Sequence, residues 1–432
     1  MDLAQLNISY QKYLANLPKF ATMKENYLGK TQAELEYKQL AGQSNYFYNK
    51  NILKTFVKTE TAYVLSNKIS YLSKSNDKEV IKDIEYYLAE SGNKHDQSIF
   101  QQMLIFGEAY ELAFVTNGTV KFKVLSPLNT YIHRNDYDDV DYAMYIFTRD
   151  KDAFGVEKNT FVDVFTSTNI FHYQLLNGTL EPMSVKVEEH YFGSVPVSIC
   201  TLSEDKERDT IYEDIKLISA AYNVTMSNQI NEYSDFRNAY INFHNMDITP
   251  EDAILMKTNG IIITKGQDAG VKFIIKTTDV NVNSILDKIK SDAYEVASHI
   301  DTGEKLQSNT SGEALAARMF SLTNACKAHE DSLRDCFTNR LKLLFSYLKV
   351  AENKSYSWRD IQFIFTLNLP KSDVNMSQIV ANLQNVDGLF SKSTYRSNFS
   401  FCNNPDIEEQ KVKAEQDAEP QVTLDNIPAT VA

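Results

Sequence analysis

The pattern of hydrophobic positions predicts one very long helix in the last third of the chain. Residues 313–350 contain no glycine or proline, so nothing in this stretch must break a helix. Thr310 followed by Glu313 has the spacing of a capping box, with Ser311 as the alternative N-cap. At 1.5 Å per residue, such a helix would be about 55 Å long. Its apolar residues recur at three- and four-residue steps: Leu315, Met319, Leu322, Cys326, Leu333, Phe337, Leu341, Leu344 and Leu348. A core helix of an ordinary α-rich domain has the same periodicity, so the rest of the chain must decide its role.

A second long helix is predicted before the first. No glycine or proline occurs from residue 197 to residue 249, and Pro250 is expected to end the helix. The apolar residues of this stretch form a narrow stripe at helical spacing: Ile211, Ile215, Ile218, Tyr222, Met226, Tyr233, Phe236 and Tyr240.

A compact insert and a third helix lie between the two long helices. Residues 260–264 and 271–275 are rich in β-branched side chains and predict a strand pair around a glycine-bounded turn. A helix is predicted for residues 282–300, and a short polar loop, residues 301–309, follows it. A helix that leads out, a small tip and a helix that leads back form a stalk with a knob at its end.

The remaining sequence predicts a mixed α+β region. Residues 1–74 have a helical pattern with a turn at Gly29 and a helix end at residues 69–72, whereas the period changes to two between residues 111 and 198. The expected strands are 120–124, 142–147, 161–165 and 170–175, with Asn117–Gly118 and Asn177–Gly178 as hairpin turns. A strand is also predicted at 358–369, with short helices at 376–385 and 394–399. From residue 404 onward the tail is acidic, and we expect it to be frayed by its end.

Composition places the chain among soluble globular proteins. Hydrophobic residues make up 43% of the sequence and charged residues 23%. No apolar run approaches the ~18 residues of a membrane span, and no signal peptide is evident, so we expect no membrane partner and assembly in the cytoplasm. The net charge of −13 argues against a protein that binds nucleic acid over its whole surface.

Candidate chemistry is sparse, and we expect neither an enzyme nor a cofactor or metal site. Gly29-Lys30-Thr31 resembles the end of a phosphate loop, but Lys24 stands where that motif requires glycine. The carboxylate-rich residues 136–141 have Val140 where a calcium loop needs an oxygen ligand. The four cysteines show no metal-binding spacing, and the seven histidines are scattered.

The predicted insert has a distinct charge pattern. It is locally neutral in an acidic chain, since four lysines oppose four carboxylates. The lysines are Lys257, Lys265, Lys272 and Lys276. They fit strand-edge positions that discourage aggregation. They also fit a docking surface for a partner or for nucleic acid, and the sequence leaves both interpretations open.

Several short segments occur along the chain in an order known from one protein family. They are Tyr27-Leu28-Gly29, Asn49-Lys50-Asn51, Phe56-Val57-Lys58-Thr59, Phe106-Gly107-Glu108-Ala109-Tyr110, Ser219-Ala220-Ala221-Tyr222-Asn223, Ser311-Gly312-Glu313-Ala314-Leu315 and Phe365-Thr366-Leu367-Asn368-Leu369-Pro370. Over nearly its whole length the chain resembles the portal proteins of tailed double-stranded DNA bacteriophages, in the branch of siphophages of Gram-positive hosts. It departs from them at Ser73-Lys74 and at Cys200-Thr201.

The resemblance implies the phage portal fold, which is α+β and predominantly α, in a ring of twelve subunits. Carried over to this chain, the parts are the wing (1–207), stem helix 1 (208–243), the clip (244–281), stem helix 2 (282–300), the tunnel loop (301–310), the long wing helix and strand (311–371), and a short helical crown with an acidic tail (372–432).

The resemblance also implies a function. The ring would form the channel at one capsid vertex through which double-stranded DNA is packaged and ejected, in the virion after assembly in the host cytoplasm. The tunnel-loop residues Glu304, Lys305, Gln307, Ser308 and Asn309 would make brief, sequence-independent phosphate contacts. An acidic subunit would keep the duplex centred by repulsion. The implied partners are the terminase large subunit at the clip lysines, scaffolding and major capsid proteins, and a head–tail adaptor.

A ring-forming head-completion or adaptor protein that does not act as the packaging channel is the alternative. The order of stalk, knob and polar loop favours the portal. A packaging enzyme is disfavoured because the ATP-binding motif is missing from the sequence.

Overall fold

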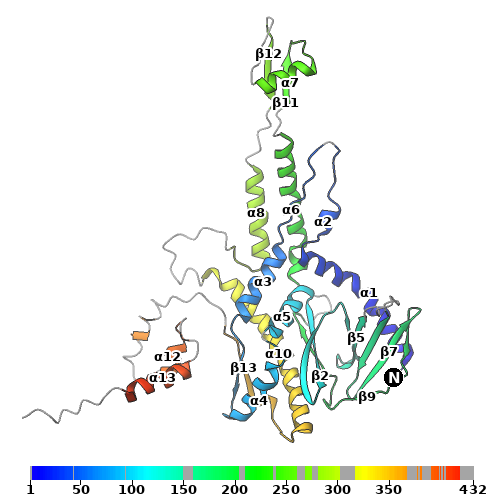
Figure 1. Ribbon diagram of the computed structural model, residues 1–432, viewed down its shortest axis with the longest axis vertical. Helices are drawn as coiled ribbons and strands as arrows, with labels where there is room; N and C mark the ends of the chain where they lie inside the picture. The colour runs from blue at the N-terminus through cyan, green and yellow to red at the C-terminus, as the bar shows by residue number, and fades with distance from the viewer. Residues whose placement is uncertain are drawn as a thin grey trace, which may run out of the picture. The chain divides into compact units, whose positions relative to one another are not determined.

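The computed structural model describes residues 2–41, 43–92, 94–148, 159–203, 210–236, 240–259, 268–274, 281–301, 317–366, 377, 380–381, 391–397, 399, 402 and 405–418. They belong to two compact units, of which the first comprises residues 1–309 and 315–367 and the second residues 310–314 and 368–432. Helices and strands are mixed throughout the first unit, so the predicted α+β class is confirmed (Figure 1).

The helices of the first unit share one large apolar core. Helices α3 (Ile52–Leu65), α5 (His95–Phe106) and α10 (Phe320–Ala351) lie together in it (Figure 1). The predicted stripe on α10 is confirmed, because its members from Leu322 to Leu348 are all buried. With 32 residues, the described helix is about 48 Å long. The predicted capping box lies outside the described residues.

Two antiparallel sheets extend this core, and the four predicted strands are confirmed. The three-stranded sheet has the order β10-β2-β3 and packs against α5 and α10. In the larger sheet β4 to β8 follow in sequence order, and β9 pairs with β7. The strands are β2 (Glu108–Thr116), β3 (Thr119–Leu125), β4 (Thr130–Arg134), β5 (Val140–Thr148), β6 (Thr160–Phe165), β7 (Asn169–Leu176), β8 (Thr179–Pro182), β9 (Glu188–Glu189) and β10 (Val197–Thr201).

Both predicted hairpin turns are confirmed. Asn117–Gly118 joins β2 to β3, and Asn177–Gly178 joins β7 to β8. All four residues have a positive φ between 50° and 83°. A left-handed conformation at both central residues matches the right-handed twist of the flanking strands, and asparagine and glycine adopt it at low cost.

Helix α1 (Leu3–Leu28) covers the larger sheet. Leu6, Tyr10 and Tyr13 are buried in a cluster with side chains of β5, β6 and β7. The hydroxyl groups of Ser9 and Tyr142 are hydrogen-bonded at 2.7 Å. Gly29 ends the helix with a φ of 92°, as the predicted turn requires, and the short α2 (Gln32–Leu35) follows.

A strand pair connects the segment after α3 to the segment after α10. Strand β1 (Ser70–Ser73) pairs antiparallel with β13 (Ile361–Ile364), and the rings of Tyr71 and Phe363 lie 5.6 Å apart. The helix end predicted at residues 69–72 is therefore wrong, because cross-strand pairing with a distant segment overrides the local pattern. The strand predicted from residue 358 begins at Ile361, after the short 3-10 helix η1 (Trp358–Asp360). Helix α4 (Lys78–Ala89) follows β1 in the chain.

Helices α6 (Ile211–Phe236) and α8 (Asn281–Val296) pack side by side and are the two predicted stalk helices (Figure 1). The second long helix ends earlier than predicted, because Tyr240 belongs to β11 (Tyr240–His244). This strand pairs antiparallel with β12 (Gly270–Ile274). The sequence predicted residues 260–264 as the partner of β12, and these residues lie outside the described ones. Pro250 does not end a helix but begins α7 (Pro250–Asn259), where the first turn needs no N–H donor.

The second unit contains α12 (Lys392–Ser397) and α13 (Pro405–Ala418). The end of the tail, where fraying is predicted, lies outside the described residues, whereas residues 405–418 form a helix. Their charges pair along the helix, since Lys411 lies 3.4 Å from Glu408 and Lys413 lies 3.3 Å from Glu409. Most of the helix predicted at 376–385 lies outside the described residues.

A buried ion pair joins α10 to the three-stranded sheet. Arg340 is 1% exposed; its Nε donates to Oε2 of Glu111 at 2.8 Å, and its Nη2 lies 2.7 Å from Oε1. His95 Nε2 lies 2.6 Å from Oε1 of Glu111, and Asp96 lies 2.8 Å from Nη2 of Arg340. Burial alone would raise the pKa of Glu111, but the charge of Arg340 and the hydrogen bond with His95 outweigh it and lower that pKa.

Replacing Arg340 should destabilise the protein strongly. Arg340→Met leaves the Glu111 carboxylate buried without its cation, so we expect a loss of about 3–5 kcal/mol in the free energy of unfolding. Denaturant unfolding followed by circular dichroism measures this loss. Lys327→Met, at an exposed position of the same helix, is the control and should cost less than about 0.5 kcal/mol.

The loss of stability caused by Arg340→Met should become smaller as the pH falls. Because the folded-state pKa of Glu111 is lowered, the stability that its ionised form contributes is present above its unfolded pKa of about 4 and is lost as the pH falls through the folded value. Without Arg340, burial raises the pKa of Glu111, so the difference in stability between wild type and Arg340→Met should shrink as the pH falls from that raised value toward the lowered folded-state value of the wild type. A difference that stayed constant would contradict an ionised pair.

Candidate functional site: the helical stem and its insert

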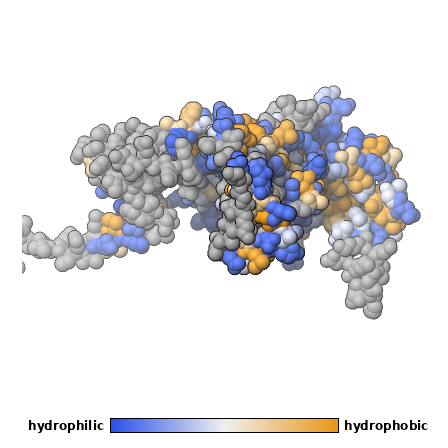
Figure 2. All heavy atoms as spheres, turned by 90° about the horizontal axis from the view of Figure 1, so that it is seen from above, coloured by the Kyte–Doolittle hydropathy of each residue, from blue (hydrophilic) through white to orange (hydrophobic). Residues whose placement is uncertain are grey.

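The stem, which we define as α6 and α8, combines a buried face with exposed apolar residues. On α8, Leu286 and Ala293 are buried, whereas Ile285 is 52% exposed and Val296 is 51% exposed. Ile285 and Ile289 line a shallow groove together with the polar Ser284 and Lys288. On α6, Leu217 is 75% exposed and Tyr233 is 73% exposed. In the space-filling view, hydrophobic and hydrophilic residues are interspersed over the face seen from above (Figure 2).

The end of α8 is fixed by an ion pair. Lys290 pairs with Asp301, the first residue of the predicted tunnel loop and the only residue of that loop among the described ones. The hydrogen bond to Asp301 raises the pKa of Lys290, and the ammonium group also lies 5.9 Å from the ring of Tyr294. The chain therefore leaves the stem from a defined position.

Side chains that are distant in the sequence meet on either side of the predicted loop. Glu60 of α3 is 1% exposed and hydrogen-bonds to Nδ1 of His329 on α10, which is 269 residues away. Its Oε2 lies 3.8 Å from Nε2 of His299, just after α8. No pattern in the sequence predicted this cluster, because neither histidine has a carboxylate at a recognisable spacing. The cluster holds the segments before and after the loop against α3.

The predicted site residues are only partly described. The tunnel-loop residues Glu304, Lys305, Gln307, Ser308 and Asn309 all lie outside the described residues, as do Lys265 and Lys276 of the insert. Lys257 lies on α7. Lys272 lies on β12, where its side chain is exposed and its backbone is opposite Asn242 of β11.

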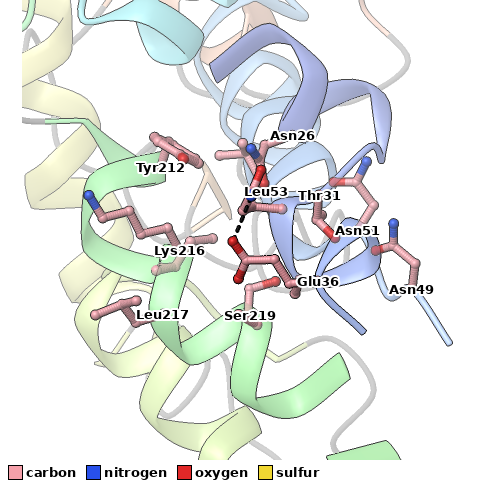
Figure 3. A pocket seen from close by; sticks show the side chains of 14 residues that line it. Asn26, Thr31, Glu36, Asn49, Asn51, Leu53, Tyr212, Lys216, Leu217 and Ser219 are labelled. Carbon is pink, nitrogen blue, oxygen red and sulfur yellow. Dashed lines mark hydrogen bonds between the residues drawn. The ribbon is translucent and has the colours of Figure 1, made fainter. Parts of the chain in front are cut away.

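A pocket of about 230 Å³ lies where α1 and α2 meet the first turns of α6 (Figure 3). Asn26, Glu36 and Asn51 face Tyr212 and Lys216 across it. Its lining contains no histidine or cysteine.

The described residues offer little for other chemistry. They contain no group of three His, Cys, Asp or Glu side chains that could hold a metal ion. Among them, no helix is long and apolar enough to cross a membrane. Cys326 and Cys336 are buried free thiols; burial raises the pKa of Cys326, and a hydrogen bond with Cys200 together with burial raises that of Cys336, which disfavours the reactive thiolate.

The solved structures that resemble this chain are distant from it. The neck of an empty gene transfer agent (GTA) particle, computed with C6 symmetry, is 11% identical, with a TM-score of 0.49. The virion of the native GTA particle is 12% identical, and the neck of the native particle, computed with C12 symmetry, is 13% identical, each with a TM-score of 0.44. Each comparison covers 80% of this chain and 88% of the other. Similarity at this level carries no argument about function. No curated protein matches the sequence.

The sequence matches one family model over residues 6–421. The matched range includes the sheets, the stem, the insert, α10 and the helices of the second unit. The model is that of the phage portal protein, SPP1 Gp6-like, which confirms the resemblance carried by the short segments of the sequence. This chain belongs to the SPP1 Gp6-like family of phage portal proteins.

Proposed function

We propose that copies of this portal protein stand side by side in a ring of twelve, with the stem helices around a channel for double-stranded DNA at one capsid vertex. The observation that carries the proposal, together with the family, is the exposure of large apolar residues on both stem helices. Leu217 and Tyr233 on α6, and Ile285 and Val296 on α8, would be removed from water between neighbouring copies.

The channel would be suited to a passing duplex. A net charge of −13 per copy repels the phosphates instead of binding them. The loop with Lys305 among small polar residues would add only brief phosphate contacts. The pairs Lys290–Asp301 and Glu60–His329 support this role, because they hold the described segments on both sides of the loop.

The insert would be the docking surface for the terminase large subunit, whose ATPase would supply the energy of packaging. Lys272 is exposed on β12, and α7 exposes Ile254 and Leu255, a mixture of charged and apolar groups that is common at interfaces. Scaffolding and major capsid proteins and a head–tail adaptor complete the proposed set of partners. The chain would act in the virion after assembly in the host cytoplasm, without an enzymatic activity of its own.

Charge placed in the stem contacts should prevent ring formation. The double variant Ile285→Asp/Val296→Asp would bury carboxylates between copies, at a cost that the contact cannot offset. We expect the ring to dissociate to monomers in mass photometry, with an unchanged far-ultraviolet circular dichroism spectrum.

The control for this variant is Ser291→Asp, which adds a carboxylate at another exposed position of α8. It should leave the ring intact. A wild-type protein that stayed monomeric at high concentration, or a double variant that still formed rings, would contradict the proposed stem contacts.

The tunnel loop can be probed at its lysine. Lys305→Ala removes one cation per copy from the proposed channel, so we expect intact rings but altered packaging efficiency in infected cells. Lys186→Ala, an exposed lysine far from the loop in the sequence, should change neither. Collapse of the Lys305→Ala ring would place this residue in an assembly contact instead of in the channel.

A further inference from the structure

An unusual polar contact runs along α6. Residues 44–50, which we call the strap, lie between α2 and α3, and alternate backbone N–H groups of the strap donate to side chains one helical turn apart. Asp235 accepts from Ser44 at 2.8 Å, Asn231 from Tyr46 at 2.7 Å, Ser227 from Tyr48 at 2.8 Å and Asn223 from Lys50 at 3.0 Å. The strap therefore runs antiparallel to the helix.

The spacing of these bonds follows from elementary geometry. Four residues of an α-helix rise by about 6.0 Å, and two residues of an extended chain span about 6.6 Å. One side chain per turn can therefore bind every second N–H group over several repeats. A slip of one residue would turn the N–H groups of Asn45, Phe47 and Asn49 toward the helix, so the pairing defines one register.

The face of α6 under the strap is buried although it is polar. Asn223 and Ser227 are fully buried, and Asn231 is 7% exposed. Asn231 also donates through Nδ2 to the carbonyl oxygen of Tyr46 at 2.8 Å and to the hydroxyl group of Tyr37 at 3.0 Å. Buried amides need such partners, so this face would be unfavourable against an apolar neighbour and is satisfied by the strap.

One end of the strap is held by hydrogen bonds at the C-terminal end of α1 and at the N-terminal end of α3. Asn51, the N-cap of α3, accepts from the N–H of Lys54 at 2.9 Å and donates to the carbonyl oxygen of Tyr27 in α1 at 2.9 Å. The side chain of Asn49 donates to the carbonyl oxygen of Gly29. The strap cannot slide along α6 without breaking these bonds.

We propose that the strap clamps α6 to the ends of α1 and α3 and fixes the position of the stem along its own axis. Asn223, Ser227, Asn231 and Asp235 are positioning residues in this device. The clamp would resist a force along the stem while DNA passes, and this role rests on the proposed function. The hydrogen bonds of the clamp do not depend on that function.

Residue-resolved hydrogen exchange tests the clamp on the intact protein. The amides of Ser44, Tyr46, Tyr48 and Lys50 should exchange slowly. Those of Asn45, Phe47 and Asn49, which form no hydrogen bond to other described backbone groups, should exchange at least about tenfold faster. This alternation is expected in rings and in isolated copies alike, so a failure of the proposed ring leaves the test valid.

Three variants separate the clamp from general stability. Asn231→Ala should speed exchange at Tyr46 about tenfold, because its acceptor is lost. Asp235→Asn keeps an oxygen acceptor and should leave Ser44 slow. Gln229→Ala, an amide truncation at a neighbouring position of α6, should leave the strap unchanged. Equal exchange at odd and even positions of the wild type would overturn the proposal. So would acceleration of Tyr46 in Gln229→Ala as large as that in Asn231→Ala.

Discussion

The charge of Arg340 is the constraint on which the first unit depends. A guanidinium group with 1% exposure needs anions, which it finds on β2 and α5 in Glu111 and Asp96. The ring of Phe337, 4.0 Å from the guanidinium carbon, and the surrounding apolar core keep water away and strengthen the pair. Because α10 follows both sheets, the stem and the insert in the chain, this contact joins α5 and β2 to a helix that comes more than 200 residues later.

The sequence was sufficient where the structural signal is local. The stripe on α10, the alternation in β5 to β7 and the Asn-Gly turns each depend on neighbouring residues only. Prediction from the sequence failed where pairing with a distant segment determines the secondary structure. Tyr240 continues the stripe of α6, yet pairing with Ile274 of β12 makes it part of a strand, and Tyr71 leaves the helical pattern to pair with Phe363.

The site was less predictable than the fold. The hydrophobic pattern located the two stalk helices and the insert between them, but nothing in the spacing of the histidines indicated that Glu60 would meet two of them. The residues under the strap are visible in the sequence at four-residue steps. A polar stripe on a helix usually faces water, however, and only the structure shows the backbone that covers Asn223 and Ser227.

The pairing of β11 with β12 has a consequence for how such proteins diverge. The chain leaves α6 and returns toward α8 through two adjacent strands, with His244 opposite Gly270. Residues 245–269, which include α7, lie between the two paired strands in the sequence. Changes in the length or chemistry of this stretch need not alter the pairing of β11 with β12, so the insert can present a different surface to a partner while the two strands that carry it stay the same.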